Sequence, residues 1–247
     1  MDASPEPPSG LRRGLAVPAL VALVALTGCA ASTSSPAESA SASPAPPLLD
    51  AGERALDPGT YRMEPSQLQN AAFPTVIVTV PEGWTSVDGW AIHSENVGVS
   101  LWNVDKVFGH PCQWQGTAFA PGDTADDLVA ALVEVPLRNP TTPEPVEIDG
   151  RPGTYFEWSV PSDIAHDGDG FPDCDSENGQ PHDFVSWTGV GTPSLRYHQG
   201  PGQVDYVWVL DMDGERMVID AYSMPDATDE AIAEIHDIVS TMRFVDG

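Results

Sequence analysis

The sequence predicts an α+β fold, in which a mostly antiparallel sheet is packed by helices. Three observations lead to this expectation. Short β-branched runs such as Thr75–Val80 recur, an Asp-Gly pair at 213–214 separates two apolar runs, and two segments have helical amphipathic spacing. Strands joined by tight turns pair antiparallel, and helices with a single apolar face pack onto such a sheet.

Strand signals fill the first part of the predicted domain. A turn at residues 56–59 leads into a short strand, and Thr75–Val80 forms the next strand, which ends at a Pro-Glu-Gly-Trp turn. Residues 90–94 and 97–104 are further strand candidates, separated by Glu95 and Asn96. Runs of this length, rich in β-branched and aromatic residues and bounded by turn residues, are typical of strands.

A helix is expected after Thr124, whose side chain is suited to cap the helix N-terminus. Asp126 and Asp127 would lie in the first turn, where negative charge is favourable. Leu128, Leu132 and Val135 follow helical spacing. Prolines at residues 140–145 end the helix and delay the next strand.

The second half of the chain predicts strands, a long acidic loop and a closing helix. Strands are expected at residues 146–148, 154–160, 184–188 and 195–198. The strongest hairpin signal joins residues 204–210 to 216–222 through Asp213 and Gly214, which suit a two-residue turn. The final helix starts at residues 225–229, and its apolar face consists of Ile232, Ile235, Ile238, Val239 and Met242.

The N-terminal segment predicts export. Arg12 and Arg13 precede an apolar run at residues 15–26 that contains Pro18. This run is shorter than the roughly 20 apolar residues that a spanning helix needs, so it is interpreted as the core of a cleaved signal peptide. Leu26-Thr27-Gly28-Cys29 resembles the lipobox of bacterial lipoproteins, whose cysteine is lipidated. The alternative is an ordinary secretory signal with an incidental Cys29. A bare arginine pair leaves open Sec or twin-arginine export.

Three segments follow from this interpretation. Residues 1–28 are the signal peptide, and residues 29–47 are the lipidated Cys29 followed by a disordered tether rich in Ser, Ala and Pro. Residues 48–247 are a single globular domain, long enough to bury a core. The expected location is the extracytoplasmic face of the cell membrane, reached through the lipid on Cys29.

Charge excludes one class of partner. The chain has 10 Lys and Arg against 37 Asp and Glu, a formal net charge of −27. Such a charge repels phosphate backbones and anionic headgroups, so a basic surface for nucleic acid is not expected.

Three stretches in the predicted domain resemble uncharacterised secreted actinobacterial lipoproteins with a PsbP-like domain. Residues 73–84 resemble the strand and Val-Pro-x-Gly-Trp opening of such domains. Residues 210–219 resemble their final hairpin, and residues 238–244 resemble their closing helix and Arg-Phe end. The resemblance implies a PsbP-like α/β/α sandwich and an extracytoplasmic location, and it carries over no catalytic residue.

Cys112 and Cys174 form the second expected site. If Cys29 carries lipid, these two cysteines are left as one pair outside the cytoplasm, where disulfides form and persist. A bridge would pin the loop around Cys174 to the turn at residues 109–111. The alternative is two separate thiols.

The acidic loop at residues 163–177 is a candidate site for calcium. Its candidate ligands are Asp167, Asp169, Asp173 and Asp175, whose spacing resembles part of a calcium loop, with Gly170 allowing a sharp turn. Aligning Gly170 with the sixth position of a calcium loop places Ala165 first and Ser176 twelfth, so both ends lack a ligand. The alternative is a solvated acidic loop without any cofactor.

Motifs of enzymes are missing from the sequence. There is no His-Glu-x-x-His zinc motif and no Gly-x-Ser-x-Gly nucleophile elbow, and no glycine loop is suited to phosphate. Four tryptophans, Trp84, Trp90, Trp102 and Trp114, are open to two interpretations: a groove for a small ligand or part of the core.

The sequence therefore favours a non-enzymatic binding or accessory module of the cell envelope, whose partner is an envelope protein or a small ligand. Two alternatives stay open: a calcium-dependent surface module that uses the acidic loop, and a cell-envelope hydrolase with a dispersed active site.

Overall fold

The computed structural model describes residues 45–64, 74–177, 182–190 and 194–245. They belong to one compact unit, Pro44–Gly247, and a second unit, Met1–Ser43, lies outside the described residues. The predicted signal peptide, Cys29 and the tether up to residue 44 therefore also lie outside them. Within the described part of the chain, no helix has the length and apolar character needed to cross a membrane.

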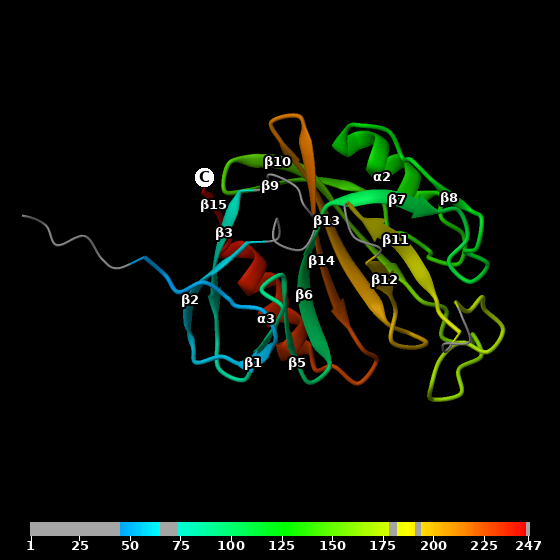
Figure 1. Ribbon diagram of the computed structural model, residues 1–247, viewed down its shortest axis with the longest axis horizontal. Helices are drawn as coiled ribbons and strands as arrows, with labels where there is room; N and C mark the ends of the chain where they lie inside the picture. Colours follow the sequence, from blue (N-terminus) through cyan, green and yellow to red (C-terminus); the bar gives the residue numbers. More distant parts are fainter. Residues whose placement is uncertain (1–44, 65–73, 178–181, 191–193, 246–247) are drawn as a thin grey trace, which may run out of the picture. The chain divides into compact units, whose positions relative to one another are not determined.

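The described residues form three antiparallel sheets (Figure 1). The largest has eight strands: β1 (Glu53–Ala55), β4 (Thr85–Val87), β5 (Ala91–Ser94), β6 (Val97–Trp102), β14 (Glu215–Ser223), β13 (Val204–Met212), β10 (Arg151–Ser159) and β9 (Glu144–Ile148). A four-stranded sheet has the order β12 (Leu195–Tyr197), β11 (Val185–Gly189), β7 (Val104–Phe108) and β8 (Ala118–Phe119). A three-stranded sheet has the order β15 (Arg243–Val245), β3 (Thr75–Val80) and β2 (Gly59–Met63).

The predicted fold class is wrong. The described residues contain fifteen strands and only two helices, α2 (Ala125–Val133) and α3 (Asp229–Ser240), so the fold is β-rich. It is not an α+β domain packed by helices, nor a PsbP-like α/β/α sandwich. The physical reason is that strands make up most of the elements, and the two helices share the cores on either side of the large sheet with the two smaller sheets.

The hairpin of β13 and β14 forms the centre of the large sheet, as the Asp-Gly signal predicts. The pairing runs without a slip from Val204 opposite Ser223 to Met212 opposite Glu215. Asp213 and Gly214 have φ angles of 61° and 98°, the left-handed region that a two-residue hairpin turn requires. Alternate side chains of the two strands therefore enter two different cores.

One core lies between the large sheet, α3 and the three-stranded sheet. It contains Tyr206, Trp208, Leu210, Met217, Ile219 and Ala221 from the central hairpin. Thr228 caps α3, and Ile235, Ile238 and Val239 of the predicted apolar face are buried. The expected amphipathic closing helix is therefore confirmed.

The other core lies between the opposite face of the large sheet, α2 and the four-stranded sheet. It contains Val207, Val209 and Val218 from the central hairpin, with Phe156, Trp158 and Trp187. Thr124 caps α2 and forms a capping box with Asp127, which confirms the expected helix start. Leu128 and Leu132 are its buried residues.

A bend at Asn103 places the four-stranded sheet over the large one. Strand β6 pairs with β14 in the large sheet, and β7, which is separated from β6 by Asn103 alone, pairs with β11 in the smaller sheet. The chain thus passes directly from one sheet to the other. This bend brings β11 and β12 opposite the inner face of β6 and β14, where the candidate site lies.

Candidate functional site

Five buried charged or titratable side chains meet between the large and the four-stranded sheets, and we call them the buried ion cluster. They are Arg138, Arg196, His198, Asp205 and Asp220. Each is at most 5% exposed. Charged residues are almost never fully buried unless they are paired, so the cluster is the most unusual polar feature of this core.

The register of the central hairpin brings the two carboxylates together. Asp205 of β13 lies opposite Tyr222, and Asp220 of β14 lies opposite Val207. Because alternate residues share a face, Asp205 and Asp220 project toward the same inner space from neighbouring strands. The sheet therefore places two negative charges where the opposing sheet supplies positive charge.

Two arginines balance these carboxylates. Arg196 of β12 donates from Nε to Asp220 Oδ2 and from Nη2 to Asp205 Oδ1 at 2.8 Å. Arg138, which follows α2, donates from Nη2 to Asp205 Oδ2. Gln203 adds a hydrogen bond from Nε2 to Asp205 Oδ1 at 2.6 Å. Asp205 is thus the hub of the cluster.

Arg138 is held by an aromatic face as well as by charge. Its guanidinium carbon lies 4.2 Å from the centre of the Trp158 ring, within the range of a cation–π contact. Leu137 and Asn139 on either side have φ angles of 65° and 46°, an uncommon backbone that turns this segment sharply. The Nε and Nη1 atoms of Arg138 have no hydrogen-bond partner among the described residues.

Burial and neighbouring charges shift the pKa values of Asp205 and Asp220 in opposite directions. Burial alone would raise the pKa of Asp205, but His198, Arg138 and Arg196 together hold it well below its usual range. Burial raises the pKa of Asp220 to about 6, although Arg196 opposes this. Asp220 Oδ1 also has no hydrogen-bond partner among the described residues. At neutral pH, two ionised carboxylates balance two guanidinium groups.

The cluster contains a Ser-His-Asp arrangement. Ser186 Oγ lies 2.7 Å from His198 Nε2, and His198 Nδ1 lies 3.2 Å from Asp205 Oδ2. A catalytic triad needs a nucleophile that substrate can touch and a base with a pKa near the working pH. Ser186 is 0% exposed, and burial and Arg138 lower the pKa of His198 to about 3. The arrangement is therefore suited to holding the two sheets together.

Replacing His198 with glutamine is expected to change how stability depends on pH. The unfolded chain binds a proton on His198 below pH 6.5, and the folded chain binds it only near pH 3. The contribution of His198 to the stability of the folded state therefore falls as pH drops from 6.5 toward 3, by about 2 kcal/mol at pH 5. Urea unfolding at pH 7 and pH 5 should show that this loss is absent in His198→Gln. An equal loss in both proteins would contradict the assignment.

A pocket of about 180 Å³ lies beside the buried ion cluster. Trp90, Trp102 and Tyr222 line it, and we call it the tryptophan pocket. Arg196 forms part of its lining, with Gln199 and the small side chain of Ala91. The rings of Trp90 and Trp102 meet edge to face, with centroids 4.8 Å apart. The pocket is thus an aromatic chamber that shares one residue, Arg196, with the cluster.

The four tryptophans named from the sequence divide between the two interpretations. Trp90 and Trp102 line the tryptophan pocket, and Trp102, which is 3% exposed, also belongs to the core beneath it. Trp84 is 1% exposed in the core and donates from Nε1 to Glu234 of α3 at 2.9 Å. Trp114 packs edge to face on Phe108 and donates from Nε1 to the Asp183 carbonyl at 3.2 Å.

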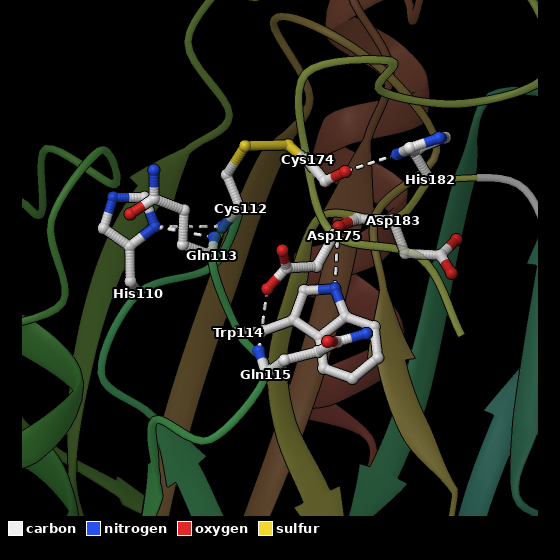
Figure 2. The surroundings of a disulfide bond; sticks show 9 residues. All are labelled: His110, Cys112, Gln113, Trp114, Gln115, Cys174, Asp175, His182 and Asp183. Atoms are coloured by element: carbon white, nitrogen blue, oxygen red, sulfur yellow. Dashed lines mark hydrogen bonds between the residues drawn. A yellow bond between two sulfur atoms is a disulfide. The ribbon is translucent and has the colours of Figure 1, made fainter. Parts of the chain in front are cut away.

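Cys112 and Cys174 form a disulfide bond, as the sequence predicts, and it joins segments 62 positions apart (Figure 2). The Asp175 amide donates to the Cys112 carbonyl at 2.8 Å, and the Gln115 amide donates to Asp175 Oδ2 at 2.8 Å. His182 Nδ1 lies within hydrogen-bond range of the Cys174 carbonyl. The bond therefore fixes the end of the acidic loop to the segment after β7.

The structure does not bring the candidate calcium ligands Asp167, Asp169, Asp173 and Asp175 into a metal site. Across the described ranges, no group of three or more His, Cys, Asp or Glu side chains is placed to hold a metal ion. Asp167 Oδ1 instead accepts hydrogen bonds from the amides of Asp169 and Gly170, at 3.1 and 3.0 Å. These bonds lower the pKa of Asp167 and shape a local turn. The carboxylate of Asp175 accepts the hydrogen bond from the Gln115 amide.

The buried ion cluster is not predicted from the sequence, although one signal for it is present. Asp205 and Asp220 each lie among apolar residues of a strand, and a charge at such a position needs a buried partner. No comparable signal marks Arg138 or Arg196.

No protein-family model and no curated protein matches this chain.

Proposed function

We propose that the protein is an exported, lipid-anchored binding module of the cell envelope, and that the tryptophan pocket is its ligand site. The observation that carries the proposal is the pocket itself, an aromatic chamber of about 180 Å³ at the junction of two sheets. Ligand sites are typically concave and mostly apolar, with a few polar groups that fix orientation. The pocket has this character, because aromatic and aliphatic walls surround Tyr222 and Arg196.

Two features support the location. The Leu26-Thr27-Gly28-Cys29 motif after a short apolar run is typical of a lipoprotein signal. The disulfide of Cys112 and Cys174 fits an oxidising compartment, because such bonds are rare where thiols are kept reduced. In this proposal, the lipid on Cys29 tethers the domain to the membrane, where it captures a small ligand.

Mass spectrometry of the protein made in its native host tests the anchor. The expected product begins at Cys29 and carries a diacylglycerol on its sulfur. A product that retains Met1, or that begins at another residue without lipid, would contradict this part of the proposal. A Cys29→Ala variant should be released from the membrane fraction.

Filling the pocket tests the binding site. Ala91 lines it, so an Ala91→Leu side chain is expected to occupy the space and weaken binding of small ring compounds at least tenfold. Calorimetric titration of the mature domain with phenol, indole and cyclohexanone measures the change. Ala233→Leu, on the exposed side of α3, is the matched control and should leave binding unchanged. Equal affinity for all three proteins would contradict the proposed site.

A further inference from the structure

The geometry points to an uncharged ligand that inserts one ring into the tryptophan pocket and accepts a hydrogen bond from Tyr222. This inference rests on the proposed function, and it adds the chemical class of the ligand. Size, charge and one free hydroxyl group each support it independently.

Size limits the inserted part to a single ring. The pocket measures about 180 Å³, and an apolar protein cavity of about 150 Å³ is known to hold one benzene molecule. A fused three-ring system would not fit. Gln199 on the lining is exposed, so further parts of a larger ligand can extend past it into solvent.

Two basic side chains line the pocket, Arg196 and His93, and each already has an acidic partner; His93 Nε2 lies 3.5 Å from Glu53 Oε1. Arg196 donates from Nε to Asp220, from Nη2 to Asp205 and from Nη1 to the Tyr197 carbonyl, so each of its three nitrogens has a protein partner. A ligand carboxylate would lose its hydration and meet a guanidinium that two carboxylates already balance. A ligand cation would lie beside that same guanidinium. The pocket therefore disfavours both signs of charge.

Tyr222 provides a hydrogen-bond donor. Its hydroxyl has no hydrogen-bond partner in the part of the chain that the structure describes, whereas Ser100 Oγ already bonds Trp102 Nε1 and the Asp220 carbonyl. Burial raises the pKa of Tyr222, so the hydroxyl keeps its proton. The hydroxyl is not among the buried polar atoms that lack a partner, so it is open to solvent, and a ligand that supplies an acceptor can take its hydrogen bond in place of water.

Gly98 holds the Tyr222 ring in this place. A Cβ atom at Gly98 would lie 2.5 Å from Tyr222 Cε1, so the ring crosses β6 where only a glycine leaves room. The guanidinium carbon of Arg196 lies 5.7 Å from the centre of the same ring. The hydroxyl therefore has a defined position from which it can discriminate between ligands.

Four probes of similar size test the inference: cyclohexanone, toluene, cyclohexanecarboxylate and cyclohexylammonium. Calorimetric titration of the disulfide-bonded mature domain should rank cyclohexanone first, toluene about tenfold weaker, and the two charged rings weaker still. Tighter binding of either charged ring would overturn the inference and leave the proposed pocket standing. If none of the four binds more tightly to the wild type than to Ala91→Leu, the proposed function fails as well.

The Tyr222→Phe variant isolates the hydroxyl. It should weaken cyclohexanone about tenfold and leave toluene unchanged, because only the ketone uses the hydrogen bond. Toluene binding also verifies that the variant is folded with an intact pocket. An equal loss for both probes, or a loss for neither, would overturn the assigned role of Tyr222.

Discussion

Replacing Asp205 with asparagine is expected to lower the free energy of unfolding by about 3–5 kcal/mol. Asp205 accepts hydrogen bonds from Arg138, Arg196 and Gln203, and all of these side chains are buried. The neutral amide leaves two guanidinium groups balanced by Asp220 alone, in a core where Arg138 is 0% exposed and cannot reach water. The loss is a large fraction of the about 5–15 kcal/mol that stabilises a typical domain.

Urea unfolding at pH 7 measures this effect, and Asp211→Asn is the matched control. Asp211 lies on the same strand but is exposed, and its Oδ1 accepts a hydrogen bond from the Gly214 amide that asparagine can still accept. The control should change stability by less than about 0.5 kcal/mol. If Asp205→Asn behaves like the control, the cluster does not hold the two sheets together.

Removing the disulfide is expected to cause the second large loss in the free energy of unfolding. The double variant Cys112→Ser with Cys174→Ser should lose about 4 kcal/mol, because the bond closes a loop of 62 positions that becomes free in the unfolded chain. Phe171 and Phe184 pack in the same small cluster as the two cysteines, so the variant also loses contacts there.

Chemical denaturation with and without a reducing agent checks this prediction. Reduced wild-type protein should unfold at the same denaturant concentration as the double variant, and the oxidised wild type at a higher one. The midpoint of the double variant should not respond to the reducing agent. Identical midpoints for the oxidised wild type and the variant would show that the bond contributes nothing to stability.

Local signals account for the features that the sequence predicts correctly. The turn at Asp213 and Gly214, the cap at Thr124 and the apolar stripe of α3 each depend on residues close together in the chain. The disulfide also follows from simple counting, because only two cysteines remain once Cys29 is assigned to lipid. Such features need no knowledge of which distant strands become neighbours.

The fold class depends on distant pairings, which is why the sequence does not predict it. The large sheet places β1 and β9 at its two edges and joins β6 to β14, more than a hundred residues later in the chain. Strand signals say that a segment is extended, but not which sheet it joins. The abrupt change of sheet at Asn103 has no local signature either, because residues 97–104 look like one continuous strand.

In the candidate site too, local sequence signals mark some residues, whereas only the three-dimensional packing places the others. Asp205 and Asp220 could have been recognised as charges within apolar strands, and their register follows from the predicted hairpin. Arg196 and Arg138 come from a short strand and a loop whose positions only the three-dimensional packing fixes. The tryptophan pocket depends on all of these elements, so a list of tryptophans could not locate it.

The Cys112–Cys174 bond also has a consequence for what happens when a protease cuts the chain. The exposed stretch at residues 165–169 lies between the two bonded cysteines in sequence, so a single cleavage there yields two fragments that stay covalently attached. Strand β10 from one fragment would still pair with β13 from the other. A molecule cut once in the acidic loop can therefore keep its fold, because the two fragments do not separate.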